Sequence, residues 1–214
     1  MSVLNQIAYF QNRRDEVPNQ ELARTLAKTK NRKGIQEIAE NLGHKNKSVR
    51  SDCLKVLYEI GYLAPELIAD YTDEFLALLK SKDNRMVWGA LIALATIADL
   101  RAKEIWAQID DVIAAMEHGT VISVVWGVKT LAHVAAQDKR HRQKLFPVLL
   151  AQIRKCIPRD VPTHAESMLC AIDDGNRKEF LAVLTSRQKE MTTAQAARLR
   201  KVMKQISGAQ KQER

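Results

Sequence analysis

Glycine, proline and aromatic residues are all scarce in this chain of 214 residues. It holds eight glycines and five prolines, and aromatic residues make up 5% of the sequence. A β-sandwich needs many turns and is usually rich in aromatic and β-branched residues, so this composition argues against one. Residues that favour helices, such as alanine, leucine, lysine, glutamine and glutamate, are abundant instead. The composition therefore predicts an all-α fold.

Cysteine is scarce as well, and catalytic and metal-binding motifs are missing. The three cysteines, Cys53, Cys156 and Cys170, form no CxxC pattern, and their odd number fits the reducing cytoplasm better than a disulfide-bonded, secreted protein. The five histidines show no spacing typical of metal ligands. The sequence contains no P-loop, GxGxxG or GxSxG motif. We therefore expect a cytoplasmic protein without metal or cofactor, and no motif predicts an enzyme.

Long apolar runs are also absent. The longest lies between Arg85 and Asp99 and includes the twelve-residue stretch Val87–Ala98, whereas a helix needs about 20 apolar residues to span a bilayer. The first residues lack the apolar core of a signal peptide. We therefore expect no contact with a membrane, and we expect the protein to be a monomer.

Positive charge is present in excess and is unevenly distributed. The formal net charge is +9, but residues 1–40 carry +2, residues 41–82 carry 0 and residues 83–138 carry −3. Residues 139–214 carry +10. This asymmetry suggests that the last third of the chain binds an anionic partner, although a solvated basic surface would have the same composition.

An internal repeat of about 38 residues runs through the chain. Its apolar residues follow the spacing i, i+4, i+7 and i+11, which is one stripe of a helix. Between the repeated segments lie further helical patterns at residues 65–81, 103–118 and 142–156. We therefore predict repeated pairs of helices, in which the second helices start with VRSDCLKVLYEI at Val49, VWGALIALATIA at Val87, VWGVKTLAHVAA at Val125 and THAESMLCAIDD at Thr163.

The paired pattern resembles HEAT repeats, which belong to the armadillo-type helical repeats. The resemblance rests on the junctions HKNKSVR and KSKDNRMV, on the Val49-Arg50 pair, and on the small residues Ala90, Ala93 and Ala95 in the second helix. It implies an α-solenoid of about five helix–turn–helix repeats over residues 33–207, preceded by a helical cap at residues 1–32. The pair Thr192 and Gln195 is spaced as a capping box at the start of the last helix, and we expect residues 208–214 to be frayed.

The two matching tryptophans have two possible roles. In a HEAT-like stack the second helices line the concave side, and the residue after the aligned position is Arg50, Trp88, Trp126 and His164 in successive repeats. Both indole rings could be wedged between adjacent repeats as part of the core. Alternatively, they could form an exposed ladder that binds a ligand by stacking and cationic contacts. The ladder would consist of Arg50, Trp88, Trp126 and His164, flanked by Lys129 and His133.

The ladder also resembles the HEAT-like alkylpurine DNA glycosylases. That resemblance implies a basic concave face that cradles DNA, and a catalytic aspartate one turn beyond a tryptophan. Here these positions hold Ile92 and Thr130. Asp52 and Glu166 lie two residues after Arg50 and His164 and therefore point away from the ladder. The resemblance thus implies a DNA-facing architecture without the catalytic group.

A second candidate site is a set of basic residues near the C-terminus. We expect the run KRHRQK to be a loop that joins two helices at one edge of the stack. Together with basic residues of later helices it could form a ridge that binds phosphates. This basic cluster comprises Lys139, Arg140, Arg142, Lys144, Arg154, Lys155, Arg198, Arg200, Lys201 and Lys204. The sequence therefore predicts a non-enzymatic module that binds a protein partner on its concave surface, with nucleic-acid binding as the alternative.

Overall fold

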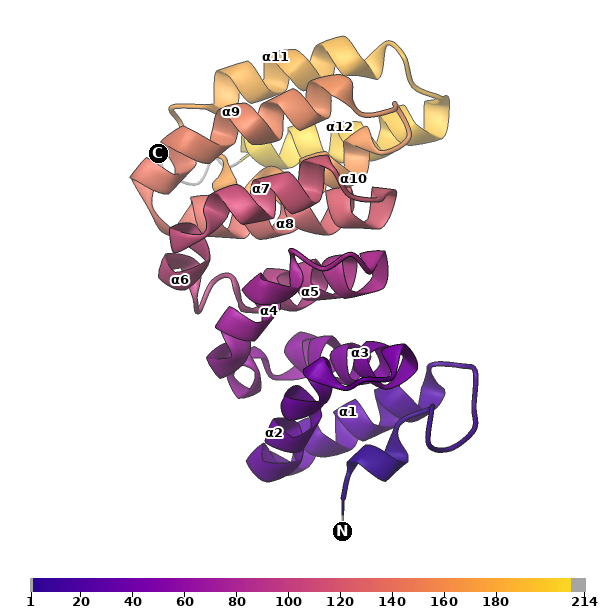
Figure 1. The fold of residues 1–214 in the computed structure, drawn as a ribbon. Coiled ribbons are helices and arrows are strands. Elements are labelled where there is room, and N and C mark those ends of the chain that lie inside the picture. The colour runs from indigo at the N-terminus through magenta and orange to yellow at the C-terminus, as the bar shows by residue number, and fades with distance from the viewer. Residues whose placement is uncertain (1, 209–214) are drawn as a thin grey trace. The chain divides into compact units, whose positions relative to one another are not determined.

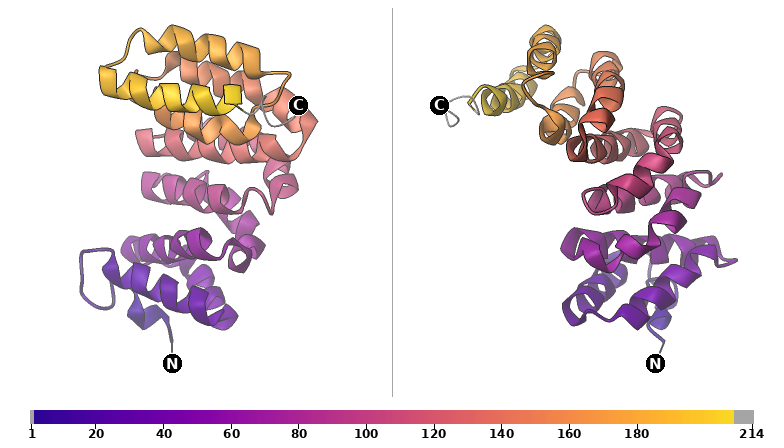
Figure 2. Two further views of the ribbon diagram at one scale, coloured as in Figure 1. Left: turned by 180° about the vertical axis from the view of Figure 1, so that it is seen from behind. Right: turned by 90° about the vertical axis from the view of Figure 1, so that its left-hand side faces the viewer.

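The computed structural model describes residues 2–208, and within that range its regular elements are all helices, without a strand. It divides into an N-terminal unit, Met1–Gly127, and a C-terminal unit, Val128–Arg214. The predicted frayed segment lies outside the described residues from residue 209 onward. Figures 1 and 2 show the helices.

The N-terminal unit contains, in chain order, η1 (Leu4–Gln6), α1 (Val17–Thr29), α2 (Arg32–Glu40), η2 (Asn41–Gly43), α3 (Lys47–Leu63), η3 (Pro65–Leu67), η4 (Ala69–Tyr71), α4 (Thr72–Leu78), α5 (Asn84–Ile97), α6 (Ala102–Ala107) and α7 (Ile109–Glu117). Helix α8 (Val121–Gln137) begins in this unit and ends in the next. The C-terminal unit continues with α9 (Lys139–Lys155), α10 (Val161–Met168), η5 (Leu169–Ala171), α11 (Arg177–Gln188) and α12 (Thr193–Gly208).

The predicted second helices are α3, α5, α8, α10 and α12, and each begins within a few residues of its expected position. Capping side chains fix these starts, because they accept hydrogen bonds from backbone N–H groups that have no partner inside the helix. Asn46 accepts from the Ser48 N–H at 2.8 Å, and Asp83 accepts from the Arg85 N–H at 3.0 Å. The predicted capping box is confirmed: Thr192 N–H donates to Gln195 Oε1 at 3.0 Å, and Gln195 N–H donates to Thr192 Oγ1 at 3.4 Å.

Two of the predicted first helices are broken, which the sequence pattern did not reveal. Residues 65–81 form two short 3-10 turns followed by α4, and residues 103–118 form α6 and α7. The second break is at Gln108, whose φ of −123° and ψ of 31° lie outside the helical range. The first of these repeats therefore has four helical pieces and the second has three, and in each the last piece is the long second helix.

The run KRHRQK is not a loop, so that prediction was wrong. It forms the first turns of α9, which starts at Lys139. Asp138 caps this helix by accepting hydrogen bonds from the N–H groups of Arg140 at 2.6 Å and His141 at 3.3 Å. Asp138 provides a good capping residue, and lysine, arginine and glutamine all favour helices. The run therefore forms a helix despite its high charge.

The predicted apolar stripes form the core of the N-terminal unit. On α3 the stripe Val49, Cys53, Val56 and Ile60 is fully buried. Burial of the Cys53 thiol raises its pKa to about 12. Helix α3 packs against α1 on one side and α5 on the other, as the N-terminal part of Figure 1 shows. Because α3 packs against a helix on each side, this apolar stripe is buried along its whole length.

Glycines at two positions allow neighbouring helices to approach closely. A Cβ atom at Gly89 would lie 2.6 Å from Leu54 Cδ2 of α3. A Cβ atom at Gly127 would lie 2.6 Å from Cβ and 3.4 Å from Cα of Met116 in α7. Both distances are too short for a larger residue, so packing explains both glycines.

Gly127→Ala should lower the free energy of unfolding by about 1–2 kcal/mol. Overpacking against the rigid Met116 Cβ costs about 1–3 kcal/mol, and the higher helix propensity of alanine recovers up to about 1 kcal/mol of this. Gly43→Ala is the matched control, because nothing lies within 4 Å of its added Cβ. Urea denaturation of the three proteins tests this. A stabilised Gly127→Ala variant would show that the two helices can separate without cost.

Candidate functional site

Four aromatic rings form a continuous cluster in the N-terminal unit. Tyr58 and Tyr62 come from α3, Trp88 from α5 and Trp126 from α8. The ring centroids of Tyr58 and Trp88 are 6.4 Å apart, those of Tyr58 and Tyr62 are 6.1 Å apart, and those of Tyr62 and Trp126 are 5.9 Å apart. We refer to Tyr58, Tyr62, Trp88 and Trp126 as the aromatic cluster.

Helical spacing and small neighbours bring these rings together. Tyr58 and Tyr62 are four residues apart and therefore lie on one face of α3. Trp88 precedes Gly89 and Trp126 precedes Gly127, so each indole stands beside a residue that lets its helix pack closely. Tyr58 is 5% exposed, Tyr62 is 45% exposed, and both tryptophans are half-buried. The cluster is therefore neither a closed core nor a set of isolated surface rings.

Lys55 supports the cluster electrostatically. Its Nζ atom lies 2.8 Å from a Glu16 carboxylate oxygen, 2.7 Å from one of Glu59 and 4.9 Å from the centroid of the Tyr58 ring. Burial alone would lower the pKa of Lys55, but the hydrogen bonds to Glu16 and Glu59 raise the pKa above its ordinary value. The ammonium group is therefore held in place, and Glu16 ties the segment before α1 to α3.

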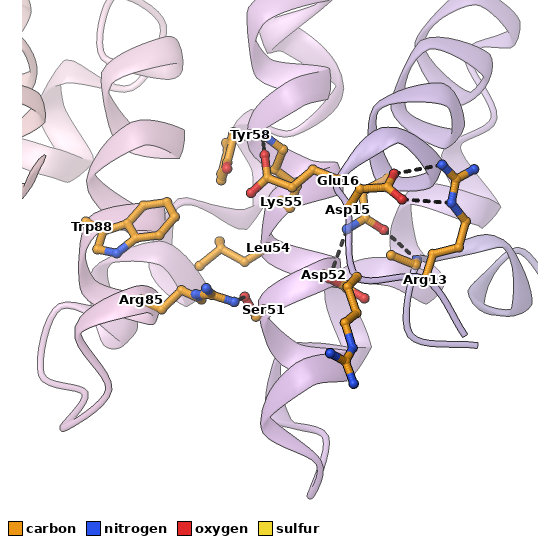
Figure 3. Close-up of a pocket in the computed structure, with 13 residues that line it drawn as sticks. Arg13, Asp15, Glu16, Ser51, Asp52, Leu54, Lys55, Tyr58, Arg85 and Trp88 are labelled. Carbon is orange, nitrogen blue, oxygen red and sulfur yellow. Dashed lines mark hydrogen bonds and ion pairs between the residues drawn. The ribbon is translucent and has the colours of Figure 1, made fainter. Parts of the chain in front are cut away.

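A small cavity of about 110 Å³ opens beside Trp88. Figure 3 shows Trp88 and Arg85 on one side, α3 with Ser51, Leu54 and Lys55 in the middle, and Arg13 with Asp15 on the opposite side. Tyr58 also lines this cavity, so it is continuous with the aromatic cluster.

A larger cavity of about 550 Å³ adjoins it and is shaped by the segment before α1. Tyr9 and Phe10 line it as an edge-to-face pair with centroids 5.1 Å apart, and both are exposed by more than 40%. Asp52 of α3 holds this segment in place, because it accepts hydrogen bonds from Tyr9 N–H at 2.8 Å and from Asn19 Nδ2 at 2.9 Å. The two cavities share Arg13, Asp52 and further residues.

Of the predicted ladder, the N-terminal unit contains Arg50, Trp88 and Trp126. Trp88 and Trp126 are joined through the two tyrosines of α3. Arg50 instead donates from its guanidinium to the His44 carbonyl oxygen at 2.8 Å, which fastens the loop before α3. The other three, Lys129, His133 and His164, belong to the C-terminal unit, where Lys129 and His133 are partly exposed.

His164 does not present its ring to solvent. It is 1% exposed, and its Nδ1 atom has no hydrogen-bond partner within the described chain. Burial lowers the pKa of His164, and the nearby Asp160 carboxylate offsets this only in part. The folded protein therefore favours the neutral imidazole, which acts as a core side chain.

The basic cluster of the C-terminal unit is partly neutralised by carboxylates. Arg142 pairs with Asp173 at 2.7 Å, Arg154 with Glu179 at 3.1 Å, and Arg198 donates to Glu166 at 2.6 Å. Lys144 and Lys155 are exposed but take part in other interactions. The remaining members are exposed and have no ion-pair partner within the described chain; these are Lys139, Arg140, Arg200, Lys201 and Lys204.

The two carboxylates considered for glycosylase chemistry are both engaged. Asp52 fastens Tyr9 and Asn19, and Glu166 pairs with Arg198. Neither is available as a catalytic group beside a tryptophan. Among the described residues no group of three or more histidine, cysteine, aspartate or glutamate side chains could hold a metal ion.

Several residues of the site were missed by sequence reasoning. Tyr58 and Tyr62 carry a local signal, since they lie four residues apart on a helix whose opposite face is apolar. The Tyr9–Phe10 pair and the arginines beside it carry none, because only the folded contact with Asp52 brings them to α3.

Comparisons with known proteins identify the fold. No protein-family model and no curated protein sequence matches the chain. Among solved structures, an engineered protein is similar with a TM-score of 0.67 and 16% identity, covering 97% of this chain and 98% of its own. A designed armadillo repeat protein is similar with a TM-score of 0.65 and 13% identity, covering 95% of this chain and 99% of its own. The fold is that of an armadillo repeat protein.

A further armadillo-fold neighbour was solved with a bound peptide. This designed repeat protein, in complex with the peptide (KR)4, has a TM-score of 0.63 and 13% identity over 86% of each chain. The predicted α-solenoid of armadillo type is thereby confirmed. The resemblance to alkylpurine DNA glycosylases remains a prediction. Within the described range, every helix is too short or too polar to cross a bilayer.

The burial of His164 predicts a pH-dependent stability. Because the pKa is lower in the folded than in the unfolded state, stability is complete above the ordinary value of 6.5 and falls as the pH drops below it. Between pH 7.5 and 5.5 the wild type should lose more stability than His164→Leu, by at most about 1.4 kcal/mol per pH unit. Urea denaturation at both pH values measures this. Equal losses in the two proteins would contradict it.

Proposed function

We propose that the N-terminal unit is a non-enzymatic module that binds an extended peptide segment of a protein partner across the aromatic cluster. The observation that carries this proposal is the run of four touching rings contributed by three successive second helices. An extended peptide laid over these helices would meet the partly exposed rings of Trp88, Tyr62 and Trp126, while the buried Tyr58 supports them.

The physical properties of the cluster suit peptide recognition. Tyrosine and tryptophan offer large contact areas and few rotatable bonds, so little entropy is lost when a ligand packs on them. Residues of these types dominate binding energy when they lie near the centre of an interface. The helices that carry the two tryptophans are closely packed at Gly89 and Gly127. A rigid base of this kind limits the cost of ordering the site on binding.

Two further observations support a peptide ligand. The armadillo-type neighbours include proteins designed for modular peptide recognition, so a solenoid of this fold is compatible with a peptide ligand. The N-terminal unit holds 16 basic and 17 acidic side chains, for a net charge of −1. A nearly neutral unit attracts no polyanion at long range, so its exposed rings suit a peptide better than nucleic acid.

A selection from a random dodecapeptide library tests the proposal. Peptides enriched on the wild-type protein should bind it with a micromolar Kd in fluorescence anisotropy. Trp88→Ala and Trp126→Ala should each weaken that binding at least about tenfold, as expected for residues at the centre of an interface.

Trp106→Ala provides the matched control, because Trp106 is a half-buried tryptophan of α6 outside the cluster. It should leave the Kd unchanged, and circular dichroism should confirm that all three variants are folded. The proposal is wrong if the enriched peptides bind the two cluster variants as tightly as the wild type. It is also wrong if no peptide is enriched.

A second candidate function is nucleic-acid binding by the C-terminal unit. Residues 128–214 hold 18 basic and 8 acidic side chains, for a net charge of +10. Helix α12 exposes Arg200, Lys201 and Lys204, which have no ion-pair partner within the described chain. Unpaired basic side chains on one helix suit contacts with phosphates, without preference for a base sequence.

Binding of a labelled 20-base-pair DNA duplex at several salt concentrations tests the second candidate. The triple change of Arg200, Lys201 and Lys204 to glutamine removes up to three phosphate contacts. Each contact contributes roughly −0.9 to the slope of the logarithm of the binding constant against the logarithm of the salt concentration, so the slope should become shallower by about 2–3. Changing Lys28, Lys30 and Lys33 to glutamine removes the same charge from the N-terminal unit and should have little effect. Equal effects of both triple variants would show that only net charge matters.

A further inference from the structure

The two adjoining cavities at the start of α3 contain more positive charge than their carboxylates can neutralise. Arg13, Arg14 and Arg85 line both cavities. Asp15 is engaged by Arg13 at 2.9 Å, and hydrogen bonds from Val17 N–H and Arg13 keep the pKa of Asp15 below its ordinary value. These contacts neutralise Arg13 but do not involve Arg14 or Arg85.

Arg14 and Arg85 have no carboxylate partner among the described residues. Arg85 makes one long contact, from Nη1 to Ser51 Oγ at 3.5 Å, and both side chains are exposed. The carboxylates nearby are already used: Asp52 by Tyr9 and Asn19, and Glu16 by Lys55. Two guanidinium groups therefore face the cavities with their donors available.

We infer that Arg14 and Arg85 bind an acidic side chain, aspartate or glutamate, of the peptide that lies on the aromatic cluster. This inference rests on the proposed function and adds the charge of the partner to it. A guanidinium group donates two parallel hydrogen bonds to a carboxylate, and such charge-assisted bonds are strong and directional.

The position of the arginines ties the acidic residue to the aromatic cluster. Trp88 is three residues after Arg85 and lies on the same side of α5, and it lines the small cavity together with Arg14. A peptide residue packed on Trp88 would therefore place a neighbouring side chain at the arginines. The larger cavity, about 550 Å³, has room for such a side chain and is walled by Tyr9 and Phe10.

A peptide carboxylate explains the charge pattern better than a nucleic acid does. At the cavities the four basic side chains Arg13, Arg14, Lys55 and Arg85 outnumber the three carboxylates Asp15, Glu16 and Asp52, whereas the N-terminal unit as a whole carries −1. A polyanion needs a broad positive field, but a single carboxylate needs only a local pair of donors. The aromatic pair Tyr9 and Phe10 adds apolar contact for the rest of the peptide residue.

Fluorescein-labelled octapeptides of alternating sequence test this inference on the full-length protein. The probes are (Tyr-Glu)4, its neutral counterpart (Tyr-Gln)4 and the basic (Tyr-Lys)4. The Kd of (Tyr-Glu)4 should be at least about tenfold lower than that of (Tyr-Gln)4 at low salt, because its carboxylates gain charge-assisted bonds. The basic peptide should bind most weakly of the three.

The double variant Arg14→Gln with Arg85→Gln should remove the preference for glutamate and leave the Kd of (Tyr-Gln)4 unchanged. The matched control changes Arg24 and Lys28 of α1, which are exposed and do not line the cavities, to glutamine. It loses the same charge and should keep the preference. A preference that survives the Arg14/Arg85 change, or is lost equally in the control, overturns the inference.

The outcomes separate this inference from the proposed function. If Trp88→Ala weakens binding of both peptides but glutamate and glutamine peptides bind the wild type equally, the peptide site stands and the acidic preference is wrong. If (Tyr-Glu)4 does not bind at all, the inference is wrong, and the library selection decides independently whether the aromatic cluster binds other peptides. Tight binding of (Tyr-Lys)4 would also overturn the acidic preference.

Discussion

The close approach of α5 to α3 is the contact on which the candidate site depends. Gly89 lies so near Leu54 that a Cβ atom would come within 2.6 Å of its side chain. Because the helices can meet this closely, the residue before Gly89 reaches across to α3, and the Trp88 ring stands 6.4 Å from Tyr58. The same relation recurs at Gly127 and Trp126, where the close contact is with Met116. The Trp-Gly pair therefore underlies both the close helix packing and the proposed peptide site.

Most of the fold could be predicted from the sequence because it depends on local periodicity. The stripe of Val49, Cys53, Val56 and Ile60 is a local pattern, and so is the capping box at Thr192. The break at Gln108 could not be predicted, since the sequence around it contains no glycine or proline, yet its backbone angles lie outside the helical range. The prediction of a loop at Lys139 was wrong, because Asp138 caps a helix there.

The candidate site was predictable only in part. The two tryptophans were identified from the repeat, whereas the tyrosines that connect them come from a different helix and were missed. The arginines beside Phe10 depend on a contact over more than 40 residues, from Asp52 to Tyr9, that no local pattern contains. His164 occupies a ladder position in the alignment, but its repeat buries it, because the same position in a helix faces solvent or core according to what packs beside it.

The uneven charge of the chain has a structural meaning that its total conceals. The net charge of +9 suggests a nucleic-acid binder, yet the unit that holds the aromatic cluster carries −1 and the other carries +10. The peptide recognition proposed for the N-terminal unit would therefore depend on short-range contacts, such as stacking and paired guanidinium donors, because a long-range field is absent. In the C-terminal unit several arginines are neutralised by Asp173, Glu179 and Glu166, while exposed basic side chains at the start of α9 and along α12 have no ion-pair partner within the described chain. The two proposed functions thus differ in their physical basis, and a partner proposed for one unit need not be a partner of the other.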